Sequence, residues 1–171
     1  PKEFLTQHGE MLKGSKGEGE YPDEEVVLFK MTDGTEIVAK KIELRKAKEA
    51  RKEFSILISA KKAGLPTAEP VGFLSGKEDT DGSYLLMKKI EGISGRNFDK
   101  YLRDTGKFTE EKIKSILQQV AQKNKEMAEL FRTTLKIDKR WRIKDTIIEL
   151  NEETGEVENV IPIDWERAQN F

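Results

Sequence analysis

Hydrophobic and polar positions alternate along the first half of the chain, and this pattern predicts an antiparallel sheet. The runs Val26–Phe29 and Glu36–Ile42 flank the turn residues Thr32–Thr35 and predict a β-hairpin. Two further runs, Pro70–Leu74 and Ser83–Lys88, have strand character on either side of a polar, glycine-containing turn. We therefore expect these four strands to form one small sheet.

Helical spacing first appears over Ala47–Ala63. Its apolar stripe carries Glu53 to the inward edge of the helix, and Gly64 and Pro66 follow as helix-ending residues. The preceding residues 1–25 are polar and rich in glycine, most densely over Gly14–Gly19. That cluster is typical of a flexible loop, or of a loop whose backbone N–H groups approach a phosphate closely.

The second half of the chain has a different character. A short helix is predicted over Asn97–Thr105 and a long one over Thr109–Leu135, where Thr109 is a suitable N-cap. A second hairpin follows, made of Thr146–Leu150 and a strand that ends at Asp164. The predicted fold is α+β, with an N-terminal part of sheet plus one helix (residues 1–91) and a smaller, mainly helical part with a hairpin (residues 92–171).

Composition excludes several kinds of site. The 171 residues include no cysteine and one histidine, which excludes disulfide frameworks, thiolate zinc sites and histidine-rich metal sites. The formal net charge is -1, so binding to nucleic acid through bulk charge is not expected. No apolar run approaches the length of a membrane span and no signal peptide is evident, so we expect a cytoplasmic protein without a membrane contact.

Two charged residues of the first part point inward. Lys41 shares a strand face with the small residue Ala39, which leaves room for a flat ligand beside a cation, although an edge lysine that prevents aggregation has the same pattern. Glu53 is the candidate partner of this lysine. A buried ion pair costs desolvation energy, so it usually serves a purpose beyond stability.

Asp164 ends a stiff apolar strand, Val160–Ile163, at the point where polar residues resume. A carboxylate held in this way suits a metal ligand. Read alone, the stretch favours the other interpretation, in which Asp164 caps a helical turn that begins at Trp165.

The order of these elements resembles the protein-kinase-like fold, from about Val26 to Ala168. Val38-Ala-Lys-Lys41 resembles the Val-Ala-x-Lys strand, so the resemblance implies that Lys41 contacts the α- and β-phosphates of ATP and pairs with Glu53. Residues 161–168 resemble the Ile-Asp-x-x-x-Ala variant of the Asp-Phe-Gly motif, which implies that Asp164 binds Mg²⁺. The pattern is closest to the atypical branches, namely aminoglycoside phosphotransferase-like, RIO-like and lipopolysaccharide-kinase-like proteins.

The segment Tyr84–Gly92 resembles the strand and hinge that join the two kinase lobes. The resemblance places Met87 at the gatekeeper position and assigns the backbone groups of Lys88 and Ile90 to the adenine edge. Ala39 is counted with the cofactor-binding residues because it leaves room beside Lys41.

The catalytic loop departs from the family pattern. If Asp145 or Thr146 takes the asparagine position, the position of the catalytic base falls on Arg140 or Trp141, and neither is a base at neutral pH. Asp138 could be the base if the loop carries a two-residue insertion. Asp145 could be a second metal ligand.

The leading hypothesis is an ATP- and Mg²⁺-dependent phosphotransferase of the atypical kinase type with an unidentified acceptor. The alternative is a pseudokinase that binds a nucleotide or a partner without catalysis, and a purely structural domain is the least favoured. Few residues follow the metal motif, which indicates a minimal kinase, a fragment, or a chain whose smaller lobe a protein partner completes. A basic cluster is either a solvated face or a site for an anionic substrate; it comprises Lys139, Arg140, Arg142 and Lys144.

Overall fold

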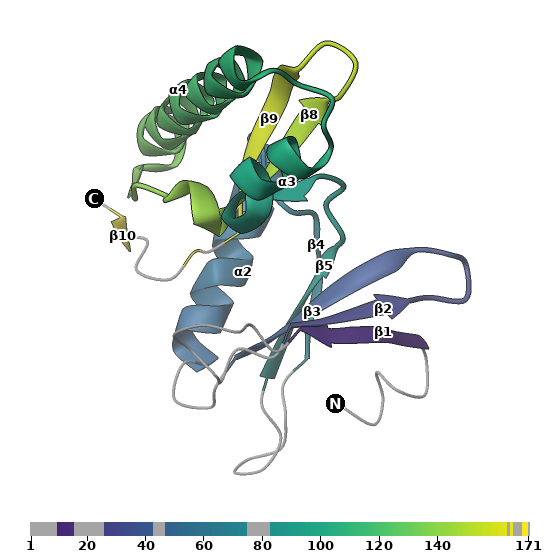
Figure 1. Cartoon of the computed structure of the whole chain (residues 1–171). Coiled ribbons are helices and arrows are strands. Elements are labelled where there is room, and N and C mark those ends of the chain that lie inside the picture. The colour runs from purple at the N-terminus through teal and green to yellow at the C-terminus, as the bar shows by residue number, and fades with distance from the viewer. Residues whose placement is uncertain are drawn as a thin grey trace. The chain divides into compact units, whose positions relative to one another are not determined.

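The computed structural model of the chain describes residues 10–15, 26–42, 47–74, 83–163, 165 and 169–170 (Figure 1). The chain divides into two compact units. One consists of Pro1–Ile58 and Glu69–Lys89, and the other of Ser59–Ala68 and Ile90–Phe171.

The first unit contains a five-stranded antiparallel sheet in the order β1-β2-β3-β5-β4. Its helix α2 (Ala47–Lys62) extends into the segment grouped with the second unit. The predicted hairpin, the helix and the other two strands are confirmed. The strands are β1 (Glu10–Ser15), β2 (Val26–Lys30), β3 (Glu36–Ile42), β4 (Pro70–Leu74) and β5 (Ser83–Lys88).

Strand β1 was not predicted, because residues 10–15 were interpreted as part of a loop. They pair along β2, with Gly14 opposite Val27 and a shift in register between Met11 and Lys13. An edge strand is held by backbone hydrogen bonds to its neighbour, so it can form without an alternating apolar pattern. Most of the glycine cluster, residues 16–19, lies outside the described residues.

Strand β3 presents different residues to the two faces of the sheet. Ala39 pairs with Leu86 and Lys40 with Leu85, so Ala39 and Lys40 point to opposite sides. On the Ala39 face, a core cluster forms from Phe29, Ala39 and Tyr84, packed with Leu74 and Leu86. The next residue along, Lys40, is therefore on the other face.

The second unit is built on the long helix α4 (Glu110–Leu135), which packs along β9 (Figure 1). The hydroxyl oxygen of Thr109 accepts a hydrogen bond from the backbone N–H of Lys112 at 3.2 Å, which confirms the predicted N-cap. The buried residues of the helix recur at the spacing of a single face. They are Ile113, Ile116, Val120, Met127 and Phe131.

The remaining elements of this unit are short, apart from the predicted hairpin. A three-stranded sheet has the order β6-β8-β9, and β7 pairs with β10. The short helix predicted over Asn97–Thr105 is a 3-10 turn followed by α3. The elements are β6 (Ile93–Ser94), η2 (Gly95–Asn97), α3 (Phe98–Asp104), β7 (Ile137–Asp138), η3 (Ile143–Asp145), β8 (Thr146–Asn151), β9 (Glu156–Pro162) and β10 (Gln169–Asn170).

The hairpin of β8 and β9 is fastened to α4 through one amide side chain. Gln119 accepts a hydrogen bond from the N–H of Val157 at 3.1 Å and donates one to the carbonyl of Gly155 at 3.4 Å. Gly155 is buried with φ +70°, a backbone conformation that favours glycine. A Cβ there would also lie 3.2 Å from the Phe108 ring and 3.3 Å from Cδ1 of Ile116, so a larger residue would be strained.

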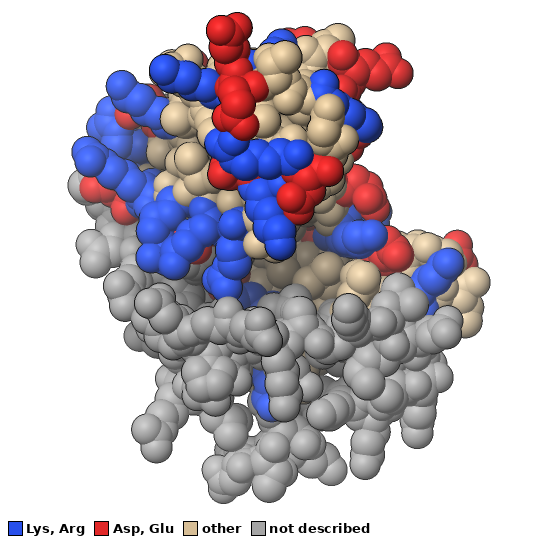
Figure 2. All heavy atoms as spheres, in the orientation of Figure 1, with Lys and Arg blue, Asp and Glu red and all other residues tan. Residues whose placement is uncertain are grey.

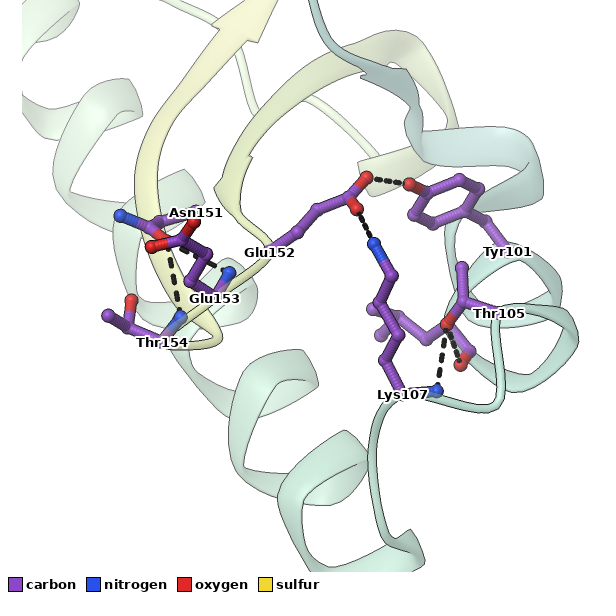
Figure 3. Close-up of polar contacts among 8 residues, drawn as sticks. Tyr101, Thr105, Lys107, Asn151, Glu152, Glu153 and Thr154 are labelled. Atoms are coloured by element: carbon purple, nitrogen blue, oxygen red, sulfur yellow. Dashed lines mark hydrogen bonds and ion pairs between the residues drawn. The ribbon is translucent and has the colours of Figure 1, made fainter.

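The same turn is joined to α3 and its following loop through Glu152 (Figure 3). Its carboxylate accepts hydrogen bonds from the Tyr101 hydroxyl and the Lys107 ammonium group. The hydrogen bond from Lys107, followed by that from Tyr101, lowers the pKa of Glu152 below its ordinary value of 4.5. The turn itself is closed by the side-chain oxygen of Asn151, which accepts from the N–H groups of Glu153 and Thr154.

Gly95 allows η2 to lie against η3. A Cβ at Gly95 would lie 1.8 Å from the carbonyl oxygen of Ile143, far inside van der Waals contact. The hydroxyl of Thr146 donates to the same carbonyl at 2.6 Å. This close approach fixes the segment that leads into β8.

We predict that Gly95→Ala destabilises the second unit by at least about 3 kcal/mol, because the added methyl group meets backbone atoms that cannot rotate away. Urea unfolding measures the effect. Gly72→Ala is the matched control, since a Cβ at Gly72 would meet no heavy atom within 4 Å. Equal stabilities of the two variants would contradict the close approach.

We also predict a pH-dependent contribution from Glu152. Because its pKa is lowered in the folded chain, its contacts add stability above pH 4.5 that is lost as the pH falls through the folded pKa. Glu152→Gln should therefore be less stable than the parent chain at pH 7, with the difference shrinking in acid. Glu153→Gln is the control, and urea titrations at several pH values provide the measurement. A constant difference across the acid range would rule out the linkage.

Candidate functional site

A buried ion pair lies between the sheet and the helix of the first unit. Lys40 Nζ on β3 is 3.5 Å from Glu53 Oε1 on α2, and the two residues are 8% and 6% exposed. The desolvation of two charges offsets much of their attraction, so such a pair contributes little net stability. What it does provide is a cation and a carboxylate in fixed positions.

The ion pair that Glu53 forms is with Lys40, the residue before the predicted partner Lys41. Lys40, opposite Leu85 on β5, carries the ion pair, whereas Lys41 is opposite Tyr84 on the Ala39 face. The two lysines are adjacent, and apolar residues stand on both faces of β3, so sequence alternation alone does not choose between them. The register between β3 and β5 determines which of the two lysines faces the helix.

Ala39 is fully buried in the cluster with Phe29 and Tyr84. Since Lys40 marks the helix face of β3, the residue two positions earlier on that face is Val38 rather than Ala39. The roles of Ala39 and Lys41 toward a nucleotide stay predictions.

The end of β5 is anchored on both sides. Lys88 donates its backbone N–H to the carbonyl of Glu69 at 2.9 Å and pairs with the Glu69 carboxylate at 2.9 Å. Lys89 bonds Glu36 in the same two ways, at 3.0 Å and 2.6 Å. Met87 is buried and Ile90 is half-buried. The strand that the resemblance assigns to the hinge is therefore held firmly up to its last residue.

In the second unit, Asp145 closes the 3-10 turn η3. Its backbone N–H donates to the carbonyl of Arg142 at 2.9 Å, and its carbonyl accepts from the N–H of Ile163 at 3.1 Å. Its side chain is 14% exposed and pairs with the guanidinium of Arg142, at 2.8 Å from Nε. Sequence reasoning had singled out both residues but missed this pair, because the 3-10 turn that brings them together was not predicted.

Asp164 lies outside the described residues, so its predicted role as a metal ligand remains a prediction. The residues next to it are described. Ile163 bonds to Asp145 through its backbone, and Trp165 is 4% exposed.

Trp165 belongs to an aromatic cluster that the sequence did not reveal. The ring centroids of Phe131, Trp141 and Trp165 are 5.0 to 5.3 Å apart in tilted or edge-to-face arrangements. This geometry is favourable for aromatic rings and fills the space between α4 and the segments before β8 and after β9. The only sequence signal was the apolar character of these positions.

Trp141, on which the aligned position of the base can fall, and Asp138, the candidate base, differ in their surroundings. Trp141 is 3% exposed within the aromatic cluster and cannot accept a proton. Asp138 is exposed on β7. The pKa of Arg132 is raised, mainly by its hydrogen bond to Glu129 and to a smaller extent by the charge of Asp138. Asp138 thus lies near the end of α4, and its role as base stays a prediction.

Among the residues that the structure describes, no three acidic or histidine side chains gather closely enough to hold a metal ion. A single carboxylate such as Asp145 still fits Mg²⁺, which takes one or two carboxylates together with phosphate oxygens. None of the described helices combines the length and apolar character needed to cross a membrane.

Lys and Arg side chains gather on the face of the second unit seen in Figure 2. Arg140 and Arg142 are exposed, and the ammonium group of Lys139 lies 5.8 Å from the centroid of the Trp141 ring. A cation over an indole ring in this way is attracted by the ring electrons. The aromatic cluster therefore also supports the basic segment.

Together the elements define an α+β fold of the protein-kinase-like class, as predicted. No protein-family model and no curated protein matches the sequence. Among solved structures, the chain is similar to WaaP, solved in complex with acyl carrier protein. The TM-score is 0.57 and the sequence identity is 16%, and the match covers 99% of this chain but 66% of WaaP. A likeness at this identity concerns the fold.

We predict that Lys40→Met destabilises the first unit by about 3 kcal/mol, because it leaves the Glu53 charge buried without this partner. The double variant Lys40→Met/Glu53→Leu should recover most of that loss. Lys41→Met is the matched control and should change stability by less than about 1 kcal/mol. The measurement is a double-mutant cycle in urea. If the loss of stability in the double variant equals the sum of the losses in the two single variants, the two charges do not interact.

Proposed function

We propose that the chain is a phosphotransferase-like protein that binds a nucleotide with Mg²⁺. The observation that supports this proposal most directly is the Lys40–Glu53 ion pair in a kinase-like fold, since a desolvated pair of this kind has no large stabilising role to explain it. Because the helix glutamate of the family pairs with the phosphate-binding lysine, we assign that role to Lys40 in place of Lys41.

The other residues have the following roles in this proposal. Lys40 contacts the α- and β-phosphates, and Glu53 keeps its ammonium group oriented. The Lys88 N–H already donates to Glu69, so an adenine bond from Lys88 would use its carbonyl oxygen. Asp145 and Asp164 would hold Mg²⁺, which when bound neutralises charge on the phosphates. Asp138 is the candidate base, and a loose transition state demands little from it.

A nucleotide-binding module without catalysis is the second candidate. It is favoured by Trp141, a buried aromatic residue that takes the position of the base if Thr146 takes the asparagine position. WaaP forms a complex with acyl carrier protein. By analogy, we propose that this chain also has a protein partner and that the basic cluster at residues 139–144 contributes to the contact.

We predict that Mg-ATP raises the melting temperature of the parent chain. Ligand at about 100 times its Kd adds about 2.7 kcal/mol to the free energy of unfolding. Lys40→Met should lose this shift and Lys41→Met should keep it, each compared with its own ligand-free melting temperature. No shift for the parent chain would refute nucleotide binding under either candidate function.

Turnover separates the two candidates. If the chain is an enzyme, phosphate release from ATP should fall by about a hundredfold or more in Asp164→Ala, because the lost metal contact acts on the transferred phosphate. Asp138→Asn tests the base in the same assay. Release that is absent from a parent chain with a clear thermal shift would identify the non-catalytic module.

A further inference from the structure

The carboxylate of Asp145 is held in place by its surroundings. Its own backbone is bonded on two sides, to Arg142 and to Ile163. The next residue, Thr146, is fully buried and bonds the carbonyl of Ile143, against which Gly95 also packs. With 14% of its side chain exposed, Asp145 has little freedom to move.

Its counter-ion has the opposite character. The side chain of Arg142 is 67% exposed, and its second contact, from a terminal nitrogen to Oδ1, is 3.5 Å long. Solvent at the exposed arginine screens the attraction and lowers the free energy that the pair contributes. Of the two partners, the arginine has the room to move and the carboxylate does not.

The Arg142–Asp145 pair lies at the end of a basic segment. Residues 136–144 carry five Lys or Arg and one acidic residue, so the segment attracts anions. Asp145 opposes that attraction and holds one of the five cations. A neutralised Asp145 would remove the repulsion and weaken one contact of the guanidinium, whose planar donors match phosphate oxygens.

We propose that Arg142 is a positioning residue for a phosphate-bearing ligand and that it exchanges Asp145 for the phosphate when the carboxylate is neutralised. The identification of the neutralising group as Mg²⁺ and of the ligand as a nucleotide or phosphorylated acceptor rests on the proposed function. The exchange itself involves the described residues only.

The test measures the affinity for inorganic pyrophosphate by calorimetry, in low-salt buffer that contains a chelator. Asp145→Asn replaces the carboxylate with a neutral group of the same shape. It should tighten pyrophosphate binding about tenfold, the value of one charge-assisted hydrogen bond. In an Arg142→Gln background the same change should alter affinity by less than about twofold, and Arg142→Lys should restore part of the gain.

Arg140→Gln is the matched control, because Arg140 is an exposed arginine of the same segment. Arg140→Gln should weaken pyrophosphate binding both in the parent chain and in Asp145→Asn. The tenfold difference in affinity between those two should remain. An equal gain with Gln at position 142 would show a general charge effect and overturn the proposal, as would no gain in the parent background. If Asp145→Asn does not fold, Asp145→Ser provides the neutral variant.

The two proposals can fail separately. If the pyrophosphate affinities of the Asp145 and Arg142 variants change as expected but Mg-ATP does not stabilise the chain, the nucleotide function is refuted and phosphate positioning by Arg142 is retained. If Mg-ATP stabilises the chain but Asp145→Asn changes the pyrophosphate affinity equally with and without Arg142, only the role of Arg142 is refuted.

Discussion

The desolvated contact between Lys40 and Glu53 is the constraint that joins the sheet to the helix in the first unit. The register of β3 with β5 places Lys40 on the face that meets α2, and the ion pair then holds that face against the helix. A hydrophobic pair at the same positions would hold the two elements together nearly as well. The retention of two charges there is the feature that packing does not explain.

In the second unit, the main constraint is the fixed position of the turn η3, which ends at Asp145. Gly95 removes a side chain so that η2 can touch the carbonyl of Ile143, and Thr146 bonds that carbonyl from the other side. The aromatic cluster of Phe131, Trp141 and Trp165 fixes the segments that flank the turn. Asp145 therefore sits in a rigid frame, whereas its partner Arg142 remains in solvent.

Much of the fold followed from the sequence because its signals were local. Alternation predicted four strands of the first sheet, and Thr109 marked the start of α4. The features that were missed depend on distant segments. The choice between Lys40 and Lys41 needs the register with β5, the Gly95 contact needs η3 in place, and β1 is held by the edge of β2. These are tertiary facts that no single window of sequence contains.

The aromatic cluster has a practical consequence. The chain contains two tryptophans, Trp141 and Trp165, and their rings lie 5.1 Å apart. All of the indole emission of the chain therefore originates at one place, which includes Trp165, the residue that follows Asp164 in the sequence. The molecule carries its own optical reporter, and rearrangements at that junction will register as changes in quantum yield without any added label.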